Sequence, residues 1–194
     1  MFKPDIVLYL ASQSPRRRAL LKELGFKVNI IKAPDIDEIY PEHLLADEIP
    51  VYLANLKLKS FHEALPENSV LITADTIVWF ENSVLGKPAD PADAKQMLRS
   101  LSGKMHKVFT GVCLRYRNTY HSFYDATDVY FRKLTIEEID YYVDEFNPSD
   151  KAGAYGVQEW IGFIGVERIV GSYFNVMGLP THKLYSEIIE IVKV

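Results

Sequence analysis

The residues with the clearest chemical potential lie near the N-terminus. Residues 12–17, Ser-Gln-Ser-Pro-Arg-Arg, follow an apolar run at 6–11 and precede the periodic leucines of a helix. Ser14 suits a helix cap and Pro15 the first helical position. A helix N-terminus presents unpaired N–H groups to an anion, and arginine forks match phosphate oxygens. The segment therefore predicts a phosphate site, although a capped helix with solvated arginines fits these residues equally well.

A carboxylate follows the apolar, β-branched run at 69–72, where Thr73-Ala74-Asp75-Thr76 is expected at the end of a central strand. Strand ends are where α/β sheets place their sites. Asp75 there can orient and deprotonate a water or help to hold a divalent ion. The alternative is an aspartate that only caps a turn.

Asp35, Asp37 and Glu38 form an acidic loop after a second predicted strand at 27–32. Carboxylates at this density suit Mg²⁺, which one or two of them hold together with substrate phosphates. Taken alone, a solvated acidic loop explains them better.

Three further polar side chains stand in unusual surroundings. Lys57 shares the apolar side of a helix expected from about Pro50, and Lys87 lies in the rigid turn Gly-Lys-Pro. For each lysine alone, a snorkelling side chain is the default explanation. Gln158 follows two glycines and two alanines, where small residues let a ligand approach and an amide could pair with a base edge. Ordinary packing explains Gln158 as well.

The elements that must position these residues alternate along the chain. Helices are expected after 14, 50, 90, 135 and 180, with a capping box at Thr135 and Glu138. Long antiparallel strands are expected at 108–116 and 120–131, and another strand at about 163–170. This interleaving predicts an α/β fold with a mixed sheet and flanking helices, formed by one domain over residues 1–194.

Bulk properties exclude several classes of protein. The formal net charge is −4, which disfavours general nucleic-acid binding. A single cysteine permits no intrachain disulfide.

Several common sequence motifs are absent. The chain contains neither a GxxxxGK[ST] phosphate loop nor a GxSxG motif. The opening residues resemble no signal peptide, and the first apolar run is too short to span a membrane, so we expect a cytoplasmic protein without membrane partners.

In their order, these motifs resemble the Maf proteins, nucleotide pyrophosphatases related in fold to the inosine triphosphatases. The resemblance covers nearly the whole chain. The matching segments are residues 10–17, 37–38, 53–57, 74–76, 86–88, 101–112, 150–158 and 171–180. It implies an elongated mixed sheet with two lobes around a cleft.

The resemblance also implies an activity and roles for individual residues. The family hydrolyses nucleoside triphosphates to the monophosphate and pyrophosphate with Mg²⁺ or Mn²⁺, in a house-cleaning role against non-canonical nucleotides. Asp75 matches the general base, and Glu38 with Asp75 matches the acidic residues linked to metal. The positions that match phosphate-binding groups are Ser12, Arg16, Arg17, Lys57 and Lys87.

Within the family, the chain is similar to the branch that acts on dTTP and UTP. Arg16, Thr76 and Gln158 carry this similarity, whereas Glu159-Trp160, Phe174 and Met177 depart from the usual pattern, in which glycine is common after the glutamine. The resemblance further suggests a homodimer. The alternative function is a nucleotide-binding regulator of septum formation without significant catalysis.

Overall fold

A computed structural model describes residues 5–33 and 36–193. By their contacts these residues form two compact units. The first contains residues up to 75, 110–125 and 178 onward, and the second contains 76–109 and 126–177.

The first unit begins with a strand, helix and strand. β1 (Val7–Ala11) pairs in parallel with β2 (Lys27–Ile31) and with β3 (Ser69–Phe80). The connection between β1 and β2 is α1 (Pro15–Lys22), whose cap Ser14 accepts a hydrogen bond from the backbone N–H of Arg17. The predicted cap and first-turn proline are therefore confirmed.

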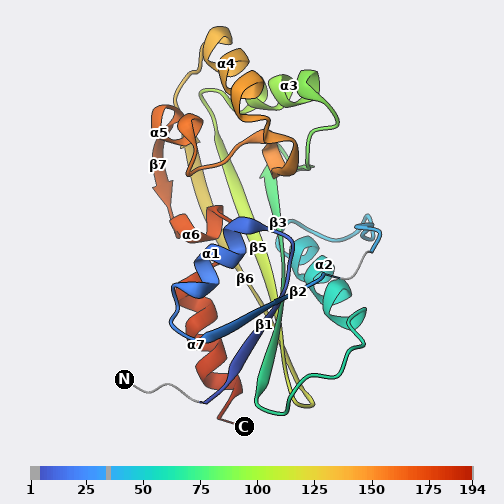
Figure 1. The fold of residues 1–194 in the computed structure, drawn as a ribbon. Helices are drawn as coiled ribbons and strands as arrows, with labels where there is room; N and C mark the ends of the chain where they lie inside the picture. Colours follow the sequence, from blue (N-terminus) through green and yellow to red (C-terminus); the bar gives the residue numbers. More distant parts are fainter. Residues whose placement is uncertain (1–4, 34–35, 194) are drawn as a thin grey trace. The chain divides into compact units, whose positions relative to one another are not determined.

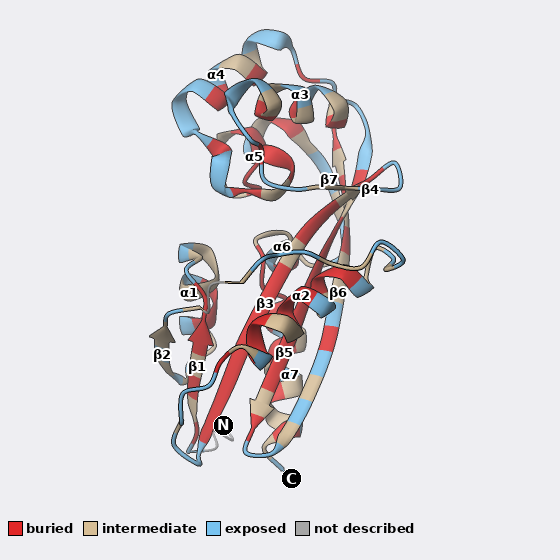
Figure 2. Cartoon of the chain, turned by 90° about the vertical axis from the view of Figure 1, so that its right-hand side faces the viewer, coloured by how far each residue is buried: buried red, intermediate tan, exposed pale blue. Residues whose placement is uncertain are grey.

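Helices cover both faces of the sheet in this unit. α2 (Glu48–Lys59) lies on one face, and α1 with α7 (Thr181–Ile191) lies on the other (Figure 1). Ala54 and Leu58 of α2 pack with Leu71 of β3 and Cys113 of β5 (Met105–Tyr116). Burial of both faces explains the continuous apolar runs of β1 and β3, which Figure 2 shows as largely buried.

In the second unit, β3 turns into β4 (Ser83–Leu85) through Glu81 and Asn82, both with positive φ. β6 (Thr119–Phe131) pairs with the antiparallel β7 (Val166–Val170). The helical elements of this unit are α3 (Pro91–Leu101), α4 (Ile136–Phe146), η1 (Pro148–Asp150), η2 (Ala152–Ala154), α5 (Trp160–Gly165) and α6 (Tyr173–Val176). Its core includes Leu98 of α3, Tyr142 of α4 and Tyr155, which follows η2.

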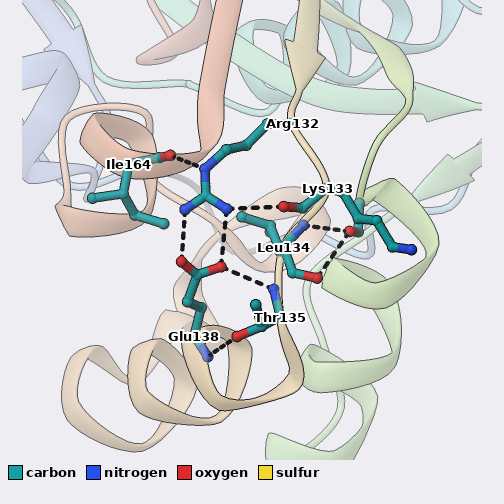
Figure 3. Close-up of polar contacts among 7 residues, drawn as sticks. Arg132, Lys133, Leu134, Thr135, Glu138 and Ile164 are labelled. Carbon is teal, nitrogen blue, oxygen red and sulfur yellow. Dashed lines mark hydrogen bonds and ion pairs between the residues drawn. The ribbon is translucent and has the colours of Figure 1, made fainter.

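The start of α4 is fixed by a polar cluster (Figure 3). Thr135 and Glu138 form the predicted capping box. Arg132 pairs with Glu138 through Nη2 at 2.7 Å and donates from Nε to the Ile164 carbonyl at 2.5 Å. These bonds join the end of β6 to α4 and α5 within the second unit.

Over the described residues the strands form one mixed, seven-stranded sheet in the order β2-β1-β3-β5-β6-β7, with β4 on β3. The predicted mixed sheet with flanking helices is therefore confirmed. The strand expected at 163–170 is wrong in its first part, because residues 163–165 end α5 and only 166–170 form β7. Gly162 permits that helix, since a Cβ there would lie 1.9 Å from the Val157 carbonyl oxygen.

Candidate active site

The serines of the loop between β1 and α1 hold its backbone. Ser12 is buried, and its Oγ accepts from the N–H of Ser14 at 3.2 Å. Arg18 donates from Nε and Nη2 to the Ser12 carbonyl at 3.2 and 3.1 Å. A hydroxyl that accepts one hydrogen bond keeps its own proton to donate. The folded loop can therefore still offer donors to an anion at the N-terminus of α1.

Arg17 joins three segments of the first unit. Its Nε donates to the Gly178 carbonyl at 2.8 Å and its Nη1 to the Ala74 carbonyl at 2.9 Å. Burial lowers the pKa of Arg17, while the nearby Asp75 acts in the opposite direction. A guanidinium remains charged in such surroundings, so the loop carries a fixed positive charge beside Asp75.

The centre of the site is a lysine between two carboxylates. Lys57 Nζ lies 2.5 Å from Asp75 Oδ1 and 2.7 Å from Glu38 Oε1. The lysine and aspartate side chains are each 11% exposed, whereas that of Glu38 is 45% exposed. Burial raises the pKa of Asp75, and Lys57 and Arg17 oppose that rise. A carboxyl group whose pKa burial raises toward the working pH suits the role of a general base.

The predicted placement of Asp75 at the end of its strand is wrong. β3 continues from Ser69 to Phe80, so Asp75 lies inside it. The strand that ends here is β1, whose pairing with β3 reaches Leu10 opposite Ile72 before the chain turns into α1. Asp75 therefore lies just beyond the carboxyl end of a parallel neighbour, which is where such sheets place their sites.

Three of the predicted residues belong to the second unit. Thr76 is partly buried and follows Asp75 in β3, so the two side chains point to opposite faces. Lys87 is exposed in the turn after β4, and the preceding Gly86 carbonyl accepts from the N–H of Gly153 at 3.0 Å. Gln158 Oε1 is buried and has no hydrogen-bond partner among the residues that the structure describes.

The first unit thus brings together Arg17, Glu38, Lys57 and Asp75, with Ser12 in the same loop as Arg17. Arg16 is close enough to Arg17 to lower the pKa of its guanidinium. In the second unit, the hydrogen bond from Gly153 to Gly86 connects the loop that contains Lys87 with the segment that leads to Gln158.

A family model for Maf-like proteins matches residues 7–191, which include all of the second unit and most of the first. The chain belongs to the Maf family.

Two curated relatives of this chain have the same name. The chain is 54% identical over 181 residues to a "dTTP/UTP pyrophosphatase" of Bacteroides fragilis, covering 93% of this chain and 94% of that protein. It is 52% identical, with the same coverage, to a protein of the same name from Phocaeicola vulgatus.

A solved structure shares the fold of this Maf chain. A HAM1 protein from Coxiella burnetii aligns with a TM-score of 0.53 and 16% identity, over 95% of this chain and 99% of that one. At this identity the similarity supports the mixed α/β architecture alone.

Among the described residues, Glu38 and Asp75 bring two carboxylates to one point of the site. Both carboxylates contact one ammonium group, so their oxygens converge on a place that accommodates positive charge. Two carboxylates suffice for Mg²⁺ when phosphates supply other ligands. Across residues 5–33 and 36–193 there is no cluster of three or more His, Cys, Asp or Glu side chains suited to a metal. Asp35 of the acidic loop lies outside the described residues, and Asp37 is exposed.

Sequence reasoning did not anticipate how the three consecutive arginines divide their contacts. Arg17 clamps Ala74 and Gly178, and Arg18 closes the Ser12 turn. The sequence distinguishes these arginines only by their positions around the helix, and those positions do not indicate carbonyl partners in distant segments.

Within the described part of the chain, no helix has the length and apolar character needed to cross a bilayer.

Proposed function

We propose that this Maf-family chain hydrolyses dTTP and UTP to the nucleoside monophosphate and pyrophosphate. The observation that carries the proposal is the buried Asp75 carboxylate held by Lys57 beside Arg17. The names of the Bacteroides and Phocaeicola relatives supply the substrate pair.

In the proposed reaction, a water loses one proton and forms a bond to phosphorus, and one phosphoanhydride bond breaks. A water attacks the α-phosphorus, the bond from this phosphorus to the bridging oxygen breaks, and pyrophosphate leaves. Lys57 donates to Asp75 Oδ1, so we assign Oδ2 to the proton of the attacking water. A general base of this kind contributes about 10²–10⁴-fold in rate.

Charge that builds on the phosphate oxygens needs fixed positive partners. Arg16 and Arg17 at α1, Lys57 and Lys87 are the groups to which we assign this work, with Ser12 as a hydroxyl donor. Preorganised donors of this type are commonly the largest contribution to catalysis. A divalent cation held by Glu38 and Asp75 would add Lewis-acid neutralisation of the triphosphate.

We assign the choice of base to Arg16, Thr76 and Gln158. The unpaired, buried Oε1 of Gln158 can accept a hydrogen bond. Thymine and uracil have an N3–H that can donate a hydrogen bond to such an oxygen, whereas N3 of cytosine carries no hydrogen. A site built to pair with a group discriminates strongly against analogues that lack it.

The decisive experiment measures pyrophosphate release from a panel of canonical and modified nucleoside triphosphates with Mg²⁺ or Mn²⁺. We expect dTTP and UTP to be preferred. Asp75→Asn should lower kcat by at least about 10²-fold while dTTP binding survives. Stoichiometric binding without pyrophosphate release by the wild-type chain would favour a regulator instead, and full activity in Asp75→Asn would remove Asp75 from its role.

We also propose that the chain acts in the cytoplasm as a homodimer, with a nucleotide as its ligand and no nucleic-acid partner. Sedimentation equilibrium of the purified chain tests the dimer, for which a monomer mass at all concentrations is the contrary result.

A further inference from the structure

The segment leading to Gln158 has a backbone that needs support. Gly153 and the non-glycine Ala154 both have positive φ, at 68° and 58°. A Cβ at Gly153 would lie 2.9 Å from Val78 Cγ2, so the segment packs tightly on β3 within the second unit. A non-glycine residue in the left-handed region persists only where its surroundings hold it there.

The Glu159 carboxylate is linked to both ends of this segment, directly to Lys151 and through the Tyr142 hydroxyl to Gly156. At the start, Lys151 is buried and its Nζ lies 3.1 Å from Glu159 Oε1 and 2.7 Å from Asp150 Oδ1. At the far end, the fully buried Tyr142 donates its hydroxyl hydrogen to Glu159 Oε2 and accepts from the N–H of Gly156 at 3.0 Å. Burial, and next the bond to Glu159, raises the pKa of Tyr142, so its hydroxyl stays protonated.

Gly156 brings this network into contact with Gln158. A Cβ at Gly156 would lie 2.7 Å from Glu159 Cδ and 2.9 Å from Gln158 Nε2. The Glu159 carboxylate and the Gln158 amide therefore both fold over the bare Cα of one glycine. A shift of Gly156 must move the amide of Gln158 as well, because side chains this close have no free space between them.

We propose that Glu159, through Tyr142 and Lys151, positions the 151–158 segment and thereby sets the discrimination of Gln158 between pyrimidine bases. The inference rests on the proposed function. Tyr142, Lys151 and Glu159 are positioning residues, since they act on the base through Gly156 and Gln158.

The test uses Tyr142→Phe and Glu159→Gln in the full chain. Tyr142→Phe keeps the ring that stacks on Phe146 but leaves the Gly156 N–H without its acceptor. The matched control is Glu138→Gln, which weakens the Arg132 pair in the same unit without touching the 151–158 segment (Figure 3). Hydrogen exchange of residues 153–158 and steady-state kinetics with dTTP and dCTP are measured for each variant.

We expect exchange at 153–158 to accelerate about 10-fold in Tyr142→Phe and not in Glu138→Gln. The ratio of kcat/KM for dTTP over dCTP should fall about 10-fold in Tyr142→Phe and Glu159→Gln, mainly through the KM for dTTP. Glu138→Gln should lower the unfolding midpoint and leave that ratio unchanged.

Three outcomes overturn the inference. One is unchanged exchange, and another is faster exchange with unaltered selectivity, which would make the network merely structural. The third is a wild-type chain that releases no pyrophosphate, which overturns the proposed function as well. The first two outcomes, observed with an active and selective wild type, overturn the inference alone.

Discussion

At the scale of single residues, Glu38 and Asp75 contact the same lysine but differ in exposure. Asp75 is buried, whereas the side chain of Glu38 is 45% exposed. An exposed carboxylate exchanges the lysine for another cation at lower desolvation cost. We therefore propose that Glu38 is the carboxylate that first binds the metal, and that Asp75 is the general base of the reaction.

Glu38→Gln should raise the Mn²⁺ concentration needed for half-maximal activity by about 10-fold, because a neutral amide binds a hard cation more weakly than a carboxylate. The measurement is pyrophosphate release across a Mn²⁺ titration after chelation, which should abolish activity in both proteins. Asp37→Asn, a change of an exposed neighbouring carboxylate, is the control. Equal Mn²⁺ requirements in wild type and Glu38→Gln would remove Glu38 from the metal site.

The buried side chain of His106 should make the stability of the folded chain depend on pH. It is fully buried between Phe131 and Tyr155, and burial lowers its pKa to about 4. The unfolded chain, with an ordinary histidine pKa of 6.5, takes up the proton first as pH falls. Stability should therefore fall below pH 6.5, and between pH 7.5 and pH 5 this histidine should contribute a loss of about 2 kcal/mol.

Urea unfolding of wild type and His106→Gln at these two pH values measures that loss. The wild type should lose more stability than the variant on acidification. An equal loss in both proteins would mean that His106 takes up its proton equally well in the folded chain.

At the scale of elements, Gly111 of β5 lets α2 approach the sheet. A Cβ at Gly111 would lie 2.3 Å from the backbone of Pro50 and Val51, which cannot move without displacing α2. Gly111→Ala should destabilise the chain by about 1–3 kcal/mol and also lower kcat, because α2 carries Lys57. Denaturant unfolding and pyrophosphate release measure the two effects. Gly86→Ala is the control for stability, since nothing lies within 4 Å of its added Cβ.

The sequence predicts elements where local signals are strong and fails where distant contacts decide. The caps at Ser14 and Thr135 are local, and both are confirmed. The start of the predicted strand at 163–170 is wrong, because the short apolar helix there depends on the close approach of Gly162 to Val157. Apolar runs of this length fit a strand or a buried helix equally well.

The same distinction applies to the site. Residue types identified Asp75, Lys57 and Glu38 as candidates, but their convergence depends on β3, α2 and the loop that precedes α2 meeting at one point. The link from Glu159 through Tyr142 to Gly156 spans separate segments and has no periodic signal. Such contacts appear only once tertiary packing is known.

At the scale of the whole molecule, we propose that residues 1–194 form a single domain despite their division into two compact units. β3, β5 and β6 each contribute residues to both units, because the boundaries between units fall inside these strands. A strand cannot lose half of its ladder without exposing unpaired backbone groups. The units should therefore unfold together in one cooperative transition.

The chain carries its own probes for this prediction. Trp79 and Trp160, the two tryptophans, both belong to the second unit, whereas Cys113, the single cysteine, is buried in the first. Tryptophan fluorescence and thiol labelling across a urea series therefore report on different units. Coincident midpoints are the expected result, because opening either unit breaks the shared strands. Separate midpoints would show that the units unfold independently, with Cys113→Ala serving to confirm that labelling reports on this thiol alone.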